Sequence, residues 1–254
     1  MKGGGGSTYI PYEHLVALGR VPGVGKNVKF GASGADIVNG DTKEVWDGNG
    51  VAYSWPTSDT ITHLKQASDQ AADRGKIVTC QGLAGDYSLV NQSKALDATN
   101  SSTLVAWDTP MIRMHSMQMT DDVVASANIS AMEATGTTHY ATMLAGNNRT
   151  LMAIYTVPLG KVALLAQYYV NHINITNKEA RSVQFDLWSR NNADGWAKQL
   201  RHKKATNKDG TTNVDSQIPV FLTFGAKCDI WLTATPEGAA TNVFAGFDLY
   251  LYDA

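Results

Sequence analysis

The feature that most constrains the fold of this chain is a long series of short segments, from Lys76 to Tyr252, in which polar and apolar residues alternate. Gly, Asn and Asp separate these segments, and cysteine and proline are rare. Alternation with a period of two is typical of β-strands, and strands of about five to nine residues with turn residues between them indicate stacked antiparallel sheets. The sequence therefore predicts a mainly β protein, and the alternation indicates no chemical site.

The strand pattern falls into two groups on either side of Gly146-Asn147-Asn148. The first group starts with a hairpin in which residues 76–82 pair with residues 87–90 across the turn Gly85-Asp86. Its other strands are expected at 103–107, 112–120, 127–132 and 139–144, whereas residues 60–73 have a loop-like or weakly helical composition. The second group has about seven strands, expected at 151–157, 162–175, 183–188, 195–203, 218–224, 229–234 and 243–252. We expect a β-rich domain at 57–145 and an antiparallel sandwich at 146–254, both jelly-roll-like.

Residues 1–56 are glycine-rich and irregular, and we expect them to form an extended N-terminal arm with one short helix. Pro11 can start this helix, Leu15 and Leu18 lie on its apolar side, and Gly19 can end it. A helix of about two turns is not stable alone in water, so it should dock on other structure.

Aromatic residues mark the places where we expect this chain to meet other surfaces. Trp46, Tyr53 and Trp55 close the arm and are predicted to anchor it to a β body. In the last strand, apolar residues occupy one face, and the other face carries Phe244, Tyr250 and Tyr252. Such a strand is covered on both sides or faces a partner subunit. The candidate assembly contacts are Tyr12, Leu15, Leu18, Phe30, Trp46, Trp55, Phe244, Tyr250 and Tyr252.

Composition and charge exclude several classes of protein. The 254 residues include 21 Lys and Arg against 23 Asp and Glu, a formal net charge of −2, so no broad positive field exists to hold nucleic acid. The two cysteines, Cys80 and Cys228, are neither a disulfide framework nor a metal-ligand pair, and we expect two buried, reduced thiols. The sequence contains no signal-peptide pattern and no apolar run of about 18 residues, which predicts a soluble protein without a membrane partner.

Sequence motifs for catalysis and cofactor binding are weak. Gly25-Lys26 resembles the end of a phosphate-binding loop, but Arg20 and Asn27 stand where that motif needs Gly and Ser or Thr. No G-x-S-x-G string, paired histidine ligands or repeated acidic motif is present. We expect no enzymatic activity, no cofactor and no metal.

A methionine-rich segment leaves one metal hypothesis open. Met111, Met114, Met117 and Met119 bracket His115, and thioethers with an imidazole can bind copper(I). In a regular strand, Met117 and Met119 share a face with His115. The same residues are also ordinary filling for a β core, which is the interpretation we favour.

Several segments resemble a family of virion structural proteins of tailed bacteriophages that is common among marine phages. The N-terminal signature is carried by residues 18–23 (LGRVPG), 28–31 (VKFG) and 44–56 (EVWDGNGVAYSWP). Residues 76–86 (KIVTCQGLAGD) resemble the first hairpin of the family's middle region, and residues 151–161 (LMAIYTVPLGK) and 245–249 (AGFDL) resemble its C-terminal module. The resemblance covers nearly the whole chain, with a polar insertion at 203–216, and it transfers no catalytic residue.

This resemblance implies a role in assembly. The expected function is a capsid decoration or minor capsid protein, with partners that are copies of itself, a trimer being one such form, and other virion proteins such as the major capsid protein. Its location would be the virion, after assembly in the bacterial cytoplasm. An arm at 1–56 would lie on neighbouring subunits, and its removal should leave a folded body.

Two alternatives remain open. One is a glycan- or receptor-binding fibre or collar module, in which Trp188, Trp196 and Trp231 stack on sugar rings. The other is a neck or baseplate connector. A connector would be present in few copies per particle, whereas a decoration protein would be present in many.

Overall fold

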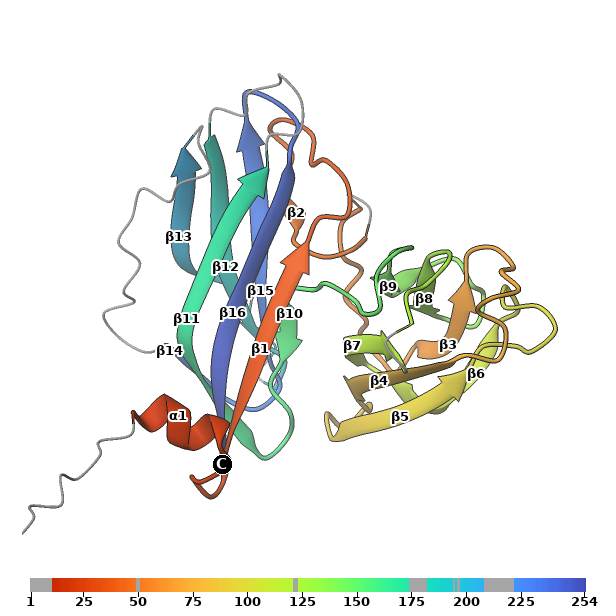
Figure 1. Cartoon of the computed structure of the whole chain (residues 1–254). Coiled ribbons are helices and arrows are strands. Elements are labelled where there is room, and N and C mark those ends of the chain that lie inside the picture. The colour runs from red at the N-terminus through yellow and green to blue at the C-terminus, as the bar shows by residue number, and fades with distance from the viewer. Residues whose placement is uncertain are drawn as a thin grey trace, which may run out of the picture.

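The structure is a computed structural model that describes residues 11–48, 51–120, 123–173, 182–193, 195, 197–207 and 222–254. Helix α1 (Tyr12–Ala17) is short, and the other regular elements of this part of the chain are β-strands in several antiparallel sheets. The strands form two bodies, a larger sandwich and a smaller β body beside it (Figure 1). The prediction of a mainly β, sandwich-like protein is confirmed.

Two facing sheets make up the sandwich. The first has the order β1 (Val24–Ala32), β16 (Asn242–Asp253), β11 (Lys161–Ile173) and β14 (Leu222–Phe224). The second has the order β10 (Ile154–Thr156), β15 (Cys228–Glu237), β12 (Ser182–Asn191) and β13 (Gln199–Asn207), and β2 (Lys43–Glu44) also pairs with β15. In the described part of the chain, each of the seven strands expected after residue 150 overlaps one of the observed strands, although several bounds differ and residues 174–175, 196 and 218–221 lie outside the described residues.

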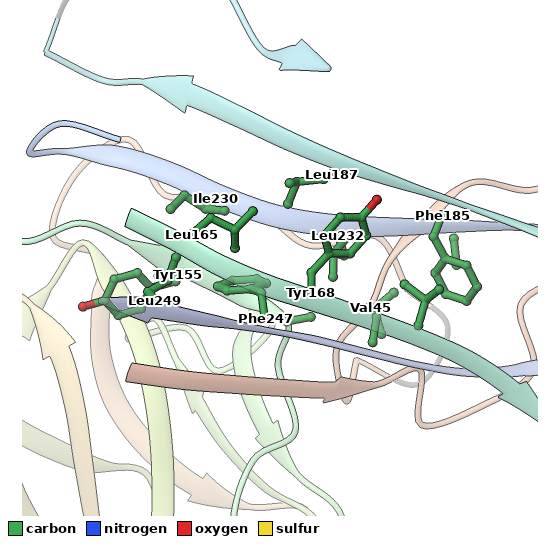
Figure 2. Packing of buried hydrophobic residues seen from close by; sticks show 14 of the residues in the cluster. Val45, Tyr155, Leu165, Tyr168, Phe185, Leu187, Ile230, Leu232, Phe247 and Leu249 are labelled. Carbon is green, nitrogen blue, oxygen red and sulfur yellow. The ribbon is translucent and has the colours of Figure 1, made fainter. Parts of the chain in front are cut away.

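Large side chains from both sheets fill the space between them (Figure 2). Tyr155, Phe185 and Phe247 are the largest fully buried side chains of this core. They come from β10, β12 and β16, where alternate residues point inward, as the period of two predicts. Full burial of one such side chain stabilises the fold by roughly 1.5–3 kcal/mol, so this core provides a large part of the stability.

The smaller body has its own core between two further sheets. One sheet has the order β6 (Val105–Met111), β3 (Ile61–Gln66), β8 (Ile129–Met132) and β9 (His139–Met143), and the other has the order β5 (Leu89–Ala95), β4 (Ile77–Leu83) and β7 (Arg113–Met119). The predicted hairpin at 76–90 is the β4–β5 pair. Methionines form much of this core, namely Met111, Met114, Met117, Met119 and Met143.

The smaller body is inserted within one edge of the sandwich. Strands β2 and β10 both pair with β15, β2 at Thr233 and Ala234 and β10 further along at residues 229–231. The chain leaves the sandwich after β2, builds the smaller body and returns at β10. Where the two connections cross, Trp46 bridges to Met152. Two hydrogen bonds also join these connections. The Asp47 N–H donates to the Leu151 carbonyl at 3.0 Å, and the Leu151 N–H donates to Asp47 Oδ2 at 2.8 Å.

The N-terminal segment differs from the expected arm. Strand β1 pairs with β16 over nine residues, from Val24 opposite Tyr252 to Ala32 opposite Phe244. Ile37 and Val45 are buried in the sandwich core. The glycines and single apolar residues that suggested an arm lie in an edge strand and in the sandwich core. Both positions depend on pairing with a strand that is distant in the sequence.

Two local expectations were also wrong. Helix α1 is present, but its buried residue is Val16, whereas Leu18 is exposed. Residues 61–66, expected as loop or weak helix, form strand β3. The strand was hidden because an irregular register between Ile61 and His63 interrupts the period of two.

A β-bulge separates His115 from the methionines of its strand. The pairing of β7 with β4 shifts between Ser116, opposite Gln81, and Met114, opposite Gly82, so His115 is the extra residue. A bulge redirects a side chain. Met114, Met117 and Met119 therefore lie in the smaller core, while the His115 ring packs on Tyr155 with centroids 4.3 Å apart. The shared face that the copper hypothesis requires is absent, and the alternative that the methionines pack the core is the one observed.

A buried ion cluster joins the two bodies. Arg113 of β7 binds Asp229 of β15 through two hydrogen bonds, Nε to Oδ1 at 2.9 Å and Nη2 to Oδ2 at 3.0 Å. Arg190 of β12 binds the same carboxylate, and the Thr156 hydroxyl donates to it at 2.6 Å. Asp229 is fully buried. Burial alone would raise the pKa of Asp229, but the hydrogen bonds and charge of Arg113 hold it below its usual value.

Lys29 is the second buried charge at this junction. Its ammonium donates to the backbone carbonyl of His115, and burial lowers the pKa of Lys29 from 10.5 to about 7. The folded protein thus favours the neutral amine, whereas the unfolded chain keeps the proton up to its ordinary pKa. The destabilisation caused by this lysine is complete below pH 7 and is relieved as the pH rises toward 10.5.

Replacement of Lys29 by methionine should remove this pH dependence. Between pH 7 and 9 the free energy of unfolding of the wild type should rise relative to Lys29→Met, by up to about 1.4 kcal/mol per pH unit. Urea unfolding of both proteins across this range measures the difference, in which the contributions of other titrating groups cancel. A constant difference would contradict a buried, titrating Lys29. Lys94→Met, at an exposed ion pair with Asp108, is the control.

Candidate interaction surface

The outward face of the sheet containing β1, β16 and β11 carries an unusual number of aromatic side chains. These three strands lie side by side in the sandwich (Figure 1). In β16 the inward residues Val243, Ala245, Phe247 and Leu249 are fully buried, so the residues between them point away from the core. We name the six aromatic residues that gather on or beside this outward face the outer aromatic face: Tyr12, Phe30, Tyr169, Phe244, Tyr250 and Tyr252.

Three of these residues form a stacked group near one end of the sheet. The Phe30 ring lies 6.1 Å from that of Phe244 and 6.3 Å from that of Tyr169, with interplanar angles of 17° and 22°. Gly246 lies opposite both Phe30 and Tyr169 in the register. A Cβ at Gly246 would lie 2.5 Å from the Tyr169 ring, so glycine is required there for the tyrosine to cross the strand. Phe30 is 41% exposed and Tyr169 38% exposed.

The other three residues lie near helix α1. The Tyr12 and Tyr250 rings meet edge to face with centroids 6.1 Å apart. Burial and a hydrogen bond with Tyr12 raise the pKa of Tyr252 to about 12. Helix α1 is therefore docked on this sheet through tyrosines, and Tyr12 remains 43% exposed.

A polar row crosses the sheet between the two aromatic groups. Lys26 Nζ lies 2.9 Å from Asp248 Oδ2, and Gln167 Nε2 donates to the same oxygen at 3.1 Å. Its hydrogen bond with Asp248 raises the pKa of Lys26 despite some burial. Gly25 and Lys26, which resemble the end of a phosphate-binding loop in the sequence, thus lie in strand β1, where Lys26 forms an ion pair. Lys26 and Asp248 therefore satisfy each other in the middle of this face.

Five of the nine predicted contact residues meet on this surface: Tyr12, Phe30, Phe244, Tyr250 and Tyr252. Leu15 is half-buried, and Leu18 is exposed beyond the end of α1. Trp46 and Trp55 lie elsewhere, because Trp46 is buried in the core of the smaller body and Trp55 packs against that core. Sequence reasoning missed Tyr169 and the exposed Val28. The alternation around Tyr169 predicts a strand, whereas Val28 was expected in the arm. Only the pairing with β16 places both residues beside Phe244.

Two of the three tryptophans predicted to stack on sugars, Trp188 and Trp231, lie on the other sheet. Trp188 and Trp231 are directly opposite in the β12–β15 pairing, with ring centroids 6.4 Å apart, and the Trp55 ring is 4.9 Å from that of Trp231. Lys198 Nζ lies 4.7 Å from the centroid of Trp188. These ring faces already contact other rings and a cation, which favours packing. Trp196 lies outside the described residues.

Comparisons of the chain with protein-family models, with curated proteins and with solved structures found no match. In the part of the chain that the structure describes, no helix is long and apolar enough to cross a membrane. Within that same part, no three His, Cys, Asp or Glu side chains are placed to hold a metal ion. Cys80 and Cys228 are free and buried, and burial raises the pKa of their thiols to about 12 and 11.

Proposed function

We propose that this protein is a structural component of a bacteriophage particle, a capsid decoration or minor capsid protein that acts through contacts between subunits. The outer aromatic face is the observation that carries the proposal. Phe30, Tyr169 and Tyr12 are each about two-fifths exposed, and Val28 between them is 55% exposed. Aromatic residues are enriched at protein interfaces, and partly exposed aromatic and aliphatic side chains gathered on one sheet face are typical of a surface that a partner covers.

The order of the strands also supports the proposal. The two sheets have the orders β1-β16-β11-β14 and β10-β15-β12-β13, with β2 and β10 both paired with β15. If β2 and β10 are counted as one interrupted strand, the order is that of an eight-stranded jelly roll. Jelly rolls are frequent in viral capsid proteins and lectins, which is support by analogy of fold.

The partner that we propose for the outer aromatic face is a second copy of this chain. The surface carries its own ion pair, Lys26–Asp248, so it requires no complementary charge from a different protein. A repeated particle component contacts identical neighbours, and in a two-fold interface both copies present the same surface. In the virion, further contacts to other particle proteins would complete the arrangement.

Substitution of Phe30 by glutamate should disrupt this contact. A charge in the middle of an apolar interface has no partner, so self-association should weaken by about tenfold or more. Sedimentation velocity of the purified protein at several concentrations measures the shift toward monomer, and complementation of a phage that lacks the gene measures incorporation into particles.

Leu89→Glu is the matched control for this test. Leu89 is a similarly exposed apolar residue, at 49%, but lies on β5 of the smaller body. The Leu89→Glu variant should leave self-association and incorporation into particles unchanged. Equal effects of the two variants, or a monomeric wild type that enters particles normally as Phe30→Glu, would contradict the proposed contact. The copy number per particle, measured on gels of purified particles, separates a decoration protein from a neck or baseplate connector.

A further inference from the structure

A cavity of about 660 Å³ lies in the smaller body, beside the segment that leaves the sandwich. Pockets of about 300–1,000 Å³ are typical of small-ligand sites. The floor of this cavity includes a row across three neighbouring strands. Lys65 of β3 is opposite Ser130 of β8, and Ser130 is opposite Thr142 of β9. The row therefore presents an ammonium and two hydroxyl groups side by side.

The first wall comes from the segment that leaves the sandwich. Trp46 donates its indole N–H to the Val51 carbonyl at 2.9 Å. Its ring lies against Gly48, where a Cβ would approach it to 2.0 Å, so this wall depends on glycine. Asp47 also lines the cavity and is fully buried. Its Oδ2 accepts from the Leu151 N–H, whereas its Oδ1 has no hydrogen-bond partner among the described residues.

The second wall is the loop between β8 and β9, and one carboxylate holds its shape. Glu133 Oε1 accepts from the backbone N–H groups of Thr137 and Thr138, both at 2.7 Å, and from the hydroxyls of Thr135 and Thr137. Burial opposes ionisation of Glu133, but these hydrogen bonds lower its pKa to about 2. Thr137 and Thr138, which line the cavity, are thus held in place before any ligand binds.

The polar groups of the cavity differ in what they can bind. Lys65 can only donate, and among the described residues its ammonium has no acceptor. Ser130 and Thr142, joined by a hydrogen bond of 3.1 Å, can do both. A ligand hydroxyl both donates and accepts, so it satisfies each of these groups. A phosphate would suit Lys65, but the ionised carboxylate of Asp47, buried in the wall, would repel it.

We propose that this cavity binds a neutral saccharide, whose hydroxyl groups bond to Lys65, Ser130 and Thr142. The site is separate from the outer aromatic face, which lies on the sandwich. It also differs from the tryptophan site considered in the sequence analysis, because its ligand is held mainly by hydrogen bonds rather than by stacking on rings.

Isothermal titration calorimetry of the full chain with a panel of neutral sugars tests the proposal. The panel contains glucose, galactose, N-acetylglucosamine, lactose, maltose and chitobiose, and inorganic phosphate is the comparison anion. At least one sugar should bind at one site per chain, and phosphate should not. Absence of binding by every sugar, or binding of phosphate alone, overturns the proposal.

Two variants locate the binding. Lys65→Ala should raise the dissociation constant by about tenfold or more, because it removes a charged hydrogen-bond donor. Ser130→Ala keeps Lys65 and should weaken binding less, and the thermal unfolding curve of each variant verifies the fold. Lys94→Ala is the control, since Lys94 lies on β5 in the other sheet of the same body. Unchanged binding in both Lys65→Ala and Ser130→Ala would place the sugar elsewhere and overturn the assignment of this cavity.

Discussion

Replacement of Asp229 by alanine should destabilise the protein by about 3–5 kcal/mol, because removal of one partner leaves a buried charge without compensation. Arg113 is almost fully buried and makes its charged contact with Asp229 alone among the described residues. Arg190 and Thr156 lose their bonds to the same carboxylate. Urea unfolding followed by tryptophan fluorescence measures this effect, and Trp55, whose ring lies 5.3 Å from the Arg113 guanidinium carbon, adds a local signal.

Two further variants make this prediction specific to the buried cluster. Asp108→Ala removes an acid from an exposed pair with Lys94 and should change stability by no more than about 1 kcal/mol. The double variant Arg113→Met and Asp229→Leu removes both buried charges and should recover a large part of the lost stability. A loss below about 1 kcal/mol in Asp229→Ala would show that the cluster does not hold the two bodies together.

Removal of residues 1–56 should prevent the sandwich from folding, contrary to what an arm would allow. The truncation removes β1 and β2, exposes the backbone of β16 along nine paired residues and deletes the core residues Ile37 and Val45. Each lost buried apolar side chain costs roughly 1.5–3 kcal/mol of stability. Together with the lost strand pairing, the total loss exceeds the usual stability of a domain, which is about 5–15 kcal/mol. Circular dichroism during heating should show no cooperative transition of the sandwich.

A chain that begins at Pro11 is the matched control, because it keeps every described contact of the N-terminal segment. It should unfold cooperatively near the wild-type temperature. If the chain that begins at Thr57 also melted at that temperature, residues 24–32 would not be a structural strand of the sandwich.

The positions of most strands could be predicted because a half-buried strand shows its period in its own residues. Strands β4, β7, β9 and β16 lie within about two residues of their expected ranges. The period fails where the pairing is irregular, as between Ile61 and His63 of β3, and where a bulge adds a residue, as at His115, which was therefore placed on the wrong face. The sequence contains no local sign of these bulges.

The candidate surface was partly predictable for a similar reason. The two apolar faces of β16 are visible in its own alternation, so Phe244, Tyr250 and Tyr252 could be named from the sequence. Phe30 and Tyr169 join them only through pairing with β16, and Trp46 and Trp55 are drawn away into the smaller body. The cavity near Asp47 left no sequence signal, because its floor and walls come from residues 47, 65, 130 and 142, which are far apart in the chain.

The sequence by itself determined the β class, the absence of a broad charged field and the strands whose residues alternate, because these properties depend on composition and on neighbouring residues. Only the tertiary structure decided that residues 24–32 complete a sheet with the last strand, that the smaller body interrupts one strand position of the sandwich, and that Asp229 joins the two bodies. Each of these depends on contacts between residues about 70 or more positions apart. Such contacts are set by the burial of whole faces and the pairing of buried charges, which no local pattern contains.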